Sequence, residues 1–306
     1  MMRRRALYKT ISDIDAFTIT ITVAAAETFT LPALGTVDAD VNWGDGSSEQ
    51  ITIESPTHLY TAAGDYQITV NGTMTGFSFN NVGSKLNLKG IDKFGSTGLT
   101  NVAGFAYGCL NCEYIKASDF DTSGVTSLFR FALNCRALTE FSGCENWDTS
   151  LVTTMQSFIQ DCRTLPSIDV SNFNTSLVSS MAGFAQNCFL LTSLNVSGWN
   201  TSNVSSMTLF AYTCNNLTDI IGFESLNMTG CTAFLAMLQN TTLPTSRYNA
   251  VLNQNTGWAS QTLNNGGGNS MHFGNSQYSL SDADAVAGRN IIQTTYNWTI
   301  TDGGGI

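Results

Sequence analysis

The chain has 306 residues and carries 13 Lys and Arg against 23 Asp and Glu, a net charge of −10. An acidic chain without a basic stripe cannot neutralise phosphates, so the composition argues against a nucleic-acid partner. No stretch approaches 18 consecutive apolar residues, so we expect no membrane insertion. A chain of this length can bury a substantial core, divided among two or three units.

Residues 1–15 are predicted to form an N-terminal arm. Its basic run, Arg3, Arg4 and Arg5, is interpreted as a solvated tail in preference to an arm that packs on a partner subunit. The segment that follows is a poor secretory signal, because acidic residues and alternating threonines interrupt its apolar part. We therefore expect no export signal.

Residues 16–80 alternate strand patterns with turns and predict a small all-β sandwich. The segment at 17–23 alternates with a period of two, Trp43 is expected in the core, and Tyr60 and Tyr66 are expected to pack on paired strands. The pieces VNWGDGSS and THLYTAAGDYQITV resemble the PKD-type (immunoglobulin-like) β-sandwich. The resemblance implies a PKD-like domain in front of the repeats.

A calcium-loop pattern lies in the same segment. Asp38, Asp40, Asn42 and Glu49 have the offsets of such a loop, but Trp43 stands where the loop requires glycine. The acids also alternate with apolar residues, which favours the solvated face of a strand. The sequence therefore predicts no metal site here.

From residue 81 to 240 the chain repeats itself every 26 or 27 residues, the mark of a stacked-repeat protein. The aligned positions are Cys109, Cys135, Cys162, Cys188 and Cys214, followed three residues later by Cys112, Leu138, Leu165, Leu191 and Leu217. Because most cysteines share one position, we interpret them as small buried hydrophobes, neither disulfides nor metal ligands. Cys231 is expected in the slot that Met155, Met181 and Met207 fill elsewhere.

Within one repeat the apolar spacing predicts first a helix and then a strand. The helical stripe is Val178, Met181, Phe184, Ala185 and Cys188, with Thr175 and Ser176 placed to cap it. Leu191, Leu194 and Val196 then follow the form L-x-x-L-x-V, which predicts a short strand with these residues pointing inward. The predicted fold class is an α/β leucine-rich-repeat solenoid, with parallel strands inside and helices outside, preceded by the sandwich and followed by a C-terminal cap.

The order W-[DN]-T-S-x-V-x-x-M-x-x-F-x-x-C-x-x-L returns with little drift between residues 100 and 240. This pattern resembles the repeat of the BspA-like leucine-rich-repeat surface proteins, of a type also found in phage virion proteins. The resemblance implies a protein that acts at a cell or particle surface.

Residues 241–306 leave the repeat and are predicted to form a C-terminal capping segment. Two stretches, 246–258 and 281–298, carry helical spacing, and Trp258, Tyr278 and Trp298 offer apolar surface to seal the last repeat. Gly266 to Gly268 are interpreted as a flexible loop without the context of a phosphate-binding motif.

The outward positions of the predicted inner strands are the candidate binding site. They are Tyr114, Lys116, Glu140, Ser142, Ser167, Asp169, Ser193, Asn195 and Asp219, and Ile221 shares the second row. Short polar side chains in a rigid array suit a glycan or a polar protein surface, although such a face can also be merely soluble. Glu140 and Asp169 are expected about 8 Å apart, which overlaps the separation in inverting glycosidases. Nothing in the sequence suggests a pocket that raises a carboxyl pKa, so we predict no catalytic site.

The sequence predicts a non-enzymatic structural or binding protein without a cofactor. We hypothesise a phage virion component, either a tail-fibre or receptor-binding subunit or one that decorates the capsid. Its partners would be other virion proteins or a glycan or protein of the host surface, and it would act in symmetric copies. The alternatives are a bacterial cell-surface adhesin and a polysaccharide-degrading enzyme.

Overall fold

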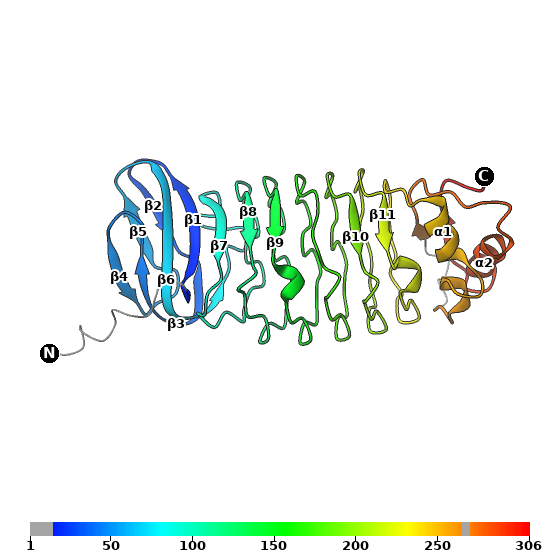
Figure 1. Ribbon diagram of the computed structural model, residues 1–306, viewed down its shortest axis with the longest axis horizontal. Coiled ribbons are helices and arrows are strands. Elements are labelled where there is room, and N and C mark those ends of the chain that lie inside the picture. The colour runs from blue at the N-terminus through cyan, green and yellow to red at the C-terminus, as the bar shows by residue number, and fades with distance from the viewer. Residues whose placement is uncertain (1–14, 265–269) are drawn as a thin grey trace.

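The structure is a computed structural model that describes residues 15–264 and 270–306. Residues 1–14 of the predicted N-terminal arm and the predicted Gly266–Gly268 loop lie outside the described residues. The described chain runs from a β-rich N-terminal part through a row of stacked coils to a helical C-terminal part (Figure 1). We call each 26- or 27-residue coil a rung.

The N-terminal part consists of two sheets. A seven-stranded sheet has the order β4-β3-β6-β1-β7-β8-β9, and a two-stranded sheet pairs β2 with β5. The strands up to the first rung are β1 (Phe17–Val23), β2 (Glu27–Thr30), β3 (Ala33–Asn42), β4 (Ser48–Ile51), β5 (Thr57–Tyr60), β6 (Gly64–Phe77) and β7 (Leu88–Lys93). Their inward residues form a continuous apolar core, with Trp43, Tyr60 and Phe77 almost completely buried.

The large sheet continues into the rungs without a break. β7 pairs antiparallel with β1 on one side and parallel with β8 (Tyr114–Lys116) on the other. β8 pairs parallel with β9 (Glu140–Ser142) in the next rung. The sheet therefore crosses the domain boundary predicted at residue 80, and the antiparallel strands supply the first partner for the repeats.

The rungs stack in the register of the sequence repeat. Isolated parallel bridges join Thr154 to Ser180, Ser180 to Ser206, and Ser206 to Ala233. The phenylalanine four residues before each repeated cysteine is buried, and neighbouring ring centroids lie 4.9, 5.8, 5.4 and 5.5 Å apart along Phe105, Phe131, Phe158, Phe184 and Phe210. Regular strand is limited to three residues in β8, β9, β10 (Ser193–Asn195) and β11 (Asp219–Ile221).

The predicted α/β leucine-rich-repeat solenoid, with helices outside the strands, is wrong. The described residues contain two α-helices, α1 (Thr245–Leu252) and α2 (Ala283–Thr294), and both lie after the repeats. Where the helical stripe was expected, Gly183 and Asn187 have φ of 64° and 60°. An α-helix needs negative φ at every residue. The rungs are therefore built from tight turns and short bridges.

The backbone hydrogen bonds show why these turns are stable. Alternate amides close turns within the rung and donate across to the next rung. The amides that donate to the next rung are those of Met181, Gly183, Ala185 and Asn187, and those that close turns are Phe184, Gln186 and Cys188. Every buried amide of the segment is therefore satisfied without a helix, as burial requires.

The predicted helix cap at Asn-Thr-Ser is also corrected. The Asn174 side-chain oxygen accepts from the Ser176 amide at 3.1 Å, which is a local turn and not a helix start. Thr175 is buried, and its hydroxyl donates to the Asn200 carbonyl of the next rung at 2.9 Å.

The last rung also departs from the predicted alignment. Because Ala233 pairs with Ser206, Cys231 occupies the position of Val204 and not the methionine slot. The same register places Thr241 at the position of Cys214 in the preceding rung.

The C-terminal part packs on the end of the rungs (Figure 1). The remaining elements among the described residues are three short 3-10 helices and two strands. They are η2 (Cys144–Asn146), η3 (Phe223–Ser225), η4 (Trp258–Ser260), β12 (Ser270–His272) and β13 (Thr299–Thr301). The fully buried Trp258 donates its indole N–H to the Phe223 carbonyl at 3.1 Å, with ring centroids 5.0 Å apart. Within the described ranges, no helix has the length and apolar character to cross a membrane.

Candidate functional site

The predicted binding residues lie along the strand edge of the rungs, which we call the strand face. β8 and β9 place Tyr114 beside Glu140 and Lys116 beside Ser142. β10 and β11 place Ser193 beside Asp219 and Asn195 beside Ile221. The residues between them, such as Ile115 and Leu194, are buried, so the candidate side chains point outward.

The strand face is interrupted between these two pairs of strands. Ser167 and Asp169 lie in a segment without strand structure. At the equivalent position of other rungs the Thr139 and Thr192 amides donate to the preceding rung. Pro166 stands at that position and has no N–H, so this hydrogen bond is lost and the ladder breaks.

Three acceptors of the strand face, Glu140, Asp169 and Asn195, each accept a hydrogen bond from the hydroxyl of a serine two residues later. Ser142 donates to Glu140 Oε1 at 2.9 Å, Ser171 donates to Asp169 Oδ1 at 2.7 Å, and Ser197 donates to Asn195 Oδ1 at 2.8 Å. Each acceptor keeps further lone pairs for a ligand. The side chains are thus held in place while remaining able to bind.

Tyr114 is the aromatic member of the strand face. Its hydroxyl donates to Asp92 at 3.1 Å, and the Lys116 ammonium lies 4.8 Å from its ring centroid. Partial burial raises the pKa of Tyr114, so the hydroxyl stays protonated and acts as a donor.

Asp219 is already bound within the protein. Arg247 of α1 donates to Asp219 at 3.0 Å and to Glu224 of η3 at 2.7 Å. The sequence reasoning missed this arginine, which opens the first helical stretch after the repeats. Asp219 therefore joins the last rung to the C-terminal helix and is the least available of the candidates.

In the carboxylate pair considered for glycoside hydrolysis, Asp169 does not suit the role of the general acid. The hydroxyl and amide of Ser171 donate to Asp169 and lower its pKa. A general acid in an inverting glycosidase needs a carboxyl whose pKa is raised. Asp169 is shifted in the opposite direction and stays ionised.

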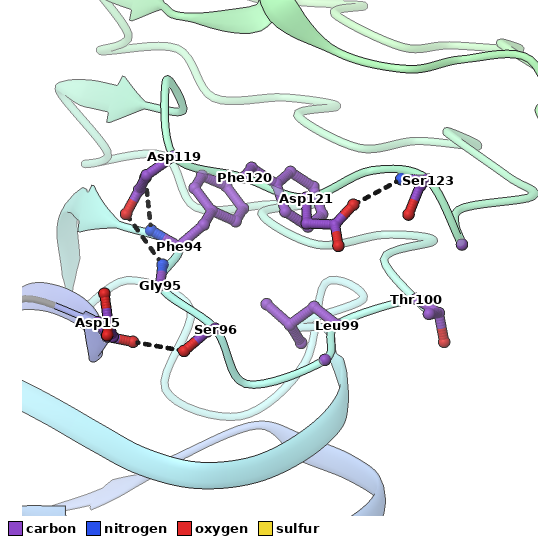
Figure 2. A pocket seen from close by; sticks show the side chains of 12 residues that line it. Asp15, Phe94, Gly95, Ser96, Leu99, Thr100, Asp119, Phe120, Asp121 and Ser123 are labelled. Atoms are coloured by element: carbon purple, nitrogen blue, oxygen red, sulfur yellow. Dashed lines mark hydrogen bonds between the residues drawn. The ribbon is translucent and has the colours of Figure 1, made fainter. Parts of the chain in front are cut away.

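A hollow of about 410 Å³ lies at the far end of β7 and β8 (Figure 2). We call it the acidic hollow, because Asp15, Asp119 and Asp121 line it. Asp119 accepts from the amides of Phe94 and Gly95 at 3.1 and 3.0 Å. The hydroxyl and amide of Ser123 lower the pKa of Asp121, and the nearby charge of Asp148 opposes that shift.

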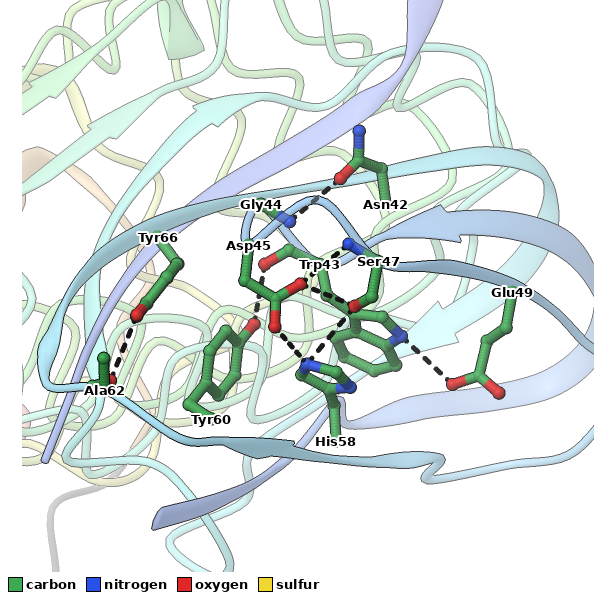
Figure 3. A network of polar contacts seen from close by, with 10 residues as sticks. All are labelled: Asn42, Trp43, Gly44, Asp45, Ser47, Glu49, His58, Tyr60, Ala62 and Tyr66. Carbon is green, nitrogen blue, oxygen red and sulfur yellow. Dashed lines mark hydrogen bonds and ion pairs between the residues drawn. The ribbon is translucent and has the colours of Figure 1, made fainter. Parts of the chain in front are cut away.

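A second polar cluster, in the N-terminal sheets, surrounds His58 (Figure 3). His58 Nε2 lies 2.8 Å from Asp45, whose carboxylate also accepts from Ser47 at 2.5 Å. These contacts, first that of Ser47, lower the pKa of Asp45 to about 2. Both Asp45 and Ser47 approach the same ring nitrogen, so the arrangement is not that of a nucleophilic triad.

The cluster holds the turn after β3 against β5. His58 stacks on Trp43 with ring centroids 4.9 Å apart, and the Tyr60 hydroxyl donates to the Trp43 carbonyl at 2.8 Å. Glu49 accepts from the Trp43 indole at 3.0 Å, while Asp38 and Asp40 are exposed. In the described part of the chain, no group of three or more His, Cys, Asp or Glu residues is placed to hold a metal ion.

The comparisons with known proteins match the rungs to a family whose function is not known. The model of a family described as "Mycoplasma protein of unknown function, DUF285" matches residues 132–250, which cover the rungs from β9 to α1. No curated protein and no solved structure matches the chain significantly. The BspA-like and PKD-like resemblances remain predictions.

Proposed function

We propose that the protein is a non-enzymatic binding protein that uses the strand face to hold a glycan or a polar protein surface. The observation that carries the proposal is the strand face itself, with outward polar side chains that lie in register in two pairs of rungs, β8 with β9 and β10 with β11. Rungs repeat at about 4.8 Å. A repeated ligand can therefore contact several rungs at once, so that weak contacts add.

The rigidity of the face supports this proposal. The side chains of Glu140, Asp169 and Asn195 are fixed by short contacts to neighbouring serines, and the backbone beneath the face packs on the apolar core. Little conformational entropy is then lost on binding, which is the main cost that a flexible surface would face.

We further propose that the protein is a virion component, in a tail fibre or on the capsid, with the host surface as its target. Its acidic surface and elongated row of rungs suit a particle-borne display protein. A bacterial surface adhesin is the second candidate, because the matching family is described as Mycoplasma proteins. Mass spectrometry of purified particles and of cell envelopes from the source organism tests the location. Presence in envelopes and absence from particles would favour the adhesin.

Binding is tested with intact host cells and labelled protein. Ser167→Arg and Ser193→Arg place bulky charges on the strand face, and we expect each to weaken binding at least tenfold. Ser202→Arg makes the same change in a turn outside the face and should leave binding unchanged. Equal binding by all three variants would contradict the proposal. If the protein releases reducing sugar from host polysaccharide and Glu140→Gln abolishes that release, the result would favour a polysaccharide-degrading enzyme.

A further inference from the structure

Three cations at one end of the rungs are held by neutral groups. Lys85 Nζ donates to the backbone and side-chain oxygens of Asn81, both at 2.6 Å. Arg136 Nε donates to Asn134 Oδ1 at 2.8 Å. In contrast, carboxylates of the described residues pair with Lys89, Arg163, Arg247 and Arg289.

The third cation, Arg130, rests on aromatic rings. Its guanidinium carbon lies 4.5 Å from the Phe129 ring centroid and 5.4 Å from that of Tyr107 in the preceding rung. Such stacking orients a guanidinium and leaves its charge available to an anion. We call Lys85, Arg130 and Arg136 the basic patch.

The members of the basic patch lie close together. The Asn81 amide donates to the Tyr107 carbonyl, and the Gly108 amide donates to the Leu133 carbonyl, both at 2.8 Å. The anchors of Lys85 and Arg136 are therefore two rungs apart, about 10 Å. Arg130 lies over Tyr107 of the rung between them. The patch thus concentrates positive charge on a chain whose net charge is −10.

The acidic hollow lies at the other end of the same rungs. The basic patch belongs to the turns that precede β7, β8 and β9, whereas the hollow is lined by the turns that follow β7 and β8. The six residues of β7 separate the two by about 20 Å. Figure 2 shows Leu99 and Phe120 near the carboxylates, and the small exposed edges of these two side chains are the apolar surface that the hollow offers to the stem of a long cationic side chain.

We propose that the basic patch of one copy docks on the acidic hollow of a second copy. Because the two surfaces lie on the same rungs at opposite strand ends, the copies associate side by side with their long axes parallel. The contact joins two different surfaces, so repetition gives either a closed ring or an open row. Charge complementarity sets the partner and the register, and salt weakens the association.

Sedimentation of the full chain at low ionic strength tests this contact. We expect concentration-dependent association that about 0.5 M salt reverses. Arg136→Glu, alone or with Arg130→Glu, should raise the dissociation constant at least tenfold. Ser202→Glu adds negative charge in an exposed turn outside the patch, the hollow and the strand face and should have little effect. If the protein stays monomeric at low salt and high concentration, the result would contradict the proposal.

Mixing two variants tests the pairing of surfaces. Arg130→Glu with Arg136→Glu breaks the patch. Asp121→Asn with Asp148→Asn removes one carboxylate that lines the hollow and the charge nearest to it in the next rung, and keeps a side-chain oxygen for each local turn. Each variant alone should be monomeric, because it lacks one of the two surfaces. Their mixture should form dimers and nothing larger, since one intact patch and one intact hollow remain. Association of either variant with itself would overturn the proposal.

Two further outcomes would assign the surfaces to other partners. If Arg3→Gln, Arg4→Gln and Arg5→Gln together abolish association and the patch variants do not, the N-terminal segment is the occupant of the hollow. If the wild-type chain is monomeric but binds an anionic polysaccharide that the patch variants do not bind, the patch serves a glycan. The cell-binding variants of the strand face leave both surfaces intact, so this proposal and the proposed function can fail separately.

Discussion

At four of its five positions, those of Cys135, Cys162, Cys188 and Cys214, the repeated cysteine donates a hydrogen bond to a carbonyl of the preceding rung. Cys162 and Cys188 donate to the carbonyls of Ala132 and Ile159 in the preceding rungs at 3.1 and 3.0 Å. All eight cysteines, every one among the described residues, are buried and free of disulfides. Their burial was predictable from the repeat position, because a residue that recurs among apolar neighbours faces the core. Their hydrogen bonds were not predictable, since the partner carbonyls depend on the turn geometry.

Because these thiols are buried, we expect the free energy of unfolding to depend on pH in the alkaline range. Burial raises the pKa of Cys214 from 9.0 to about 12. The folded thiol therefore contributes stability that is complete below pH 9 and is lost as the pH rises towards 12. Thr241 fills the same position in the last rung and makes the same bond to a preceding carbonyl.

Denaturant unfolding between pH 8 and 11 measures this dependence. Relative to the wild type, Cys214→Thr should lose less stability above pH 9, by about 1.4 kcal/mol per pH unit. Identical slopes for the two proteins would show that the thiol does not titrate on unfolding.

At the scale of the element, the apolar spacing predicted a helix and the structure has turns. The spacing of Val178, Met181 and Phe184 fits a helical period. It fits equally a chain of successive tight turns in which every third side chain faces the core. The signal that separates the two is the residue before each cysteine, which is Gly108, Asn134, Asp161 and Asn187 in successive rungs. Glycine, asparagine and aspartate are the residues that adopt positive φ most readily. Hydrogen bonds between rungs then fix the turn, and no local sequence pattern reveals these bonds.

Leu209 should be destabilising in this turn. Its φ is 57°, at the position where Gly183 stands in the preceding rung. A bulky residue in the left-handed region costs about 1 to 2 kcal/mol relative to glycine. Leu209→Gly should therefore raise the free energy of unfolding by about 1 kcal/mol after the loss of its half-buried side chain.

Thermal unfolding followed by circular dichroism measures this change. Thr208→Gly, at a neighbouring position outside the positive-φ set, is the control and should lower stability by about 0.5 to 1 kcal/mol. If both glycine variants lower stability alike, the turn is not strained at Leu209.

At the scale of the whole molecule, Arg247 joins the C-terminal part to the rungs. Its guanidinium bridges Asp219 of β11 and Glu224 of η3. Arg247→Met should leave two carboxylates without their cation and cost about 1 to 3 kcal/mol. Arg163→Met removes a part-buried pair between neighbours within one rung, which joins no separate parts of the fold, and should cost less than Arg247→Met.

Limited proteolysis locates the effect of the Arg247 variant. We expect faster cleavage between the last rung and α1 in Arg247→Met and an unchanged pattern in Arg163→Met. Equal loss of stability and equal cleavage in both variants would show that the pair adds nothing beyond an ordinary surface contact.

The sequence predicts the register of the repeats, but it does not predict how the N-terminal sheet joins the rungs. The recurrence of whole phrases predicts which residues lie beside one another, as the Thr154, Ser180 and Ser206 bridges show. The pairing of β7 with β1 depends on contacts between residues about 70 positions apart, such as Thr20 with Gly90. Such long-range pairing leaves no local pattern in the chain.

The pairing of β7 with β1 has a consequence for synthesis on the ribosome. The antiparallel strands are complete by the time residue 93 emerges, so each later coil meets an already ordered edge on which to settle. Growth can then proceed in one direction, coil after coil, without waiting for the far terminus. Until α1 arrives, however, the newest coil presents an open edge to other nascent chains. The final residues therefore end the interval in which the growing protein is prone to misassembly.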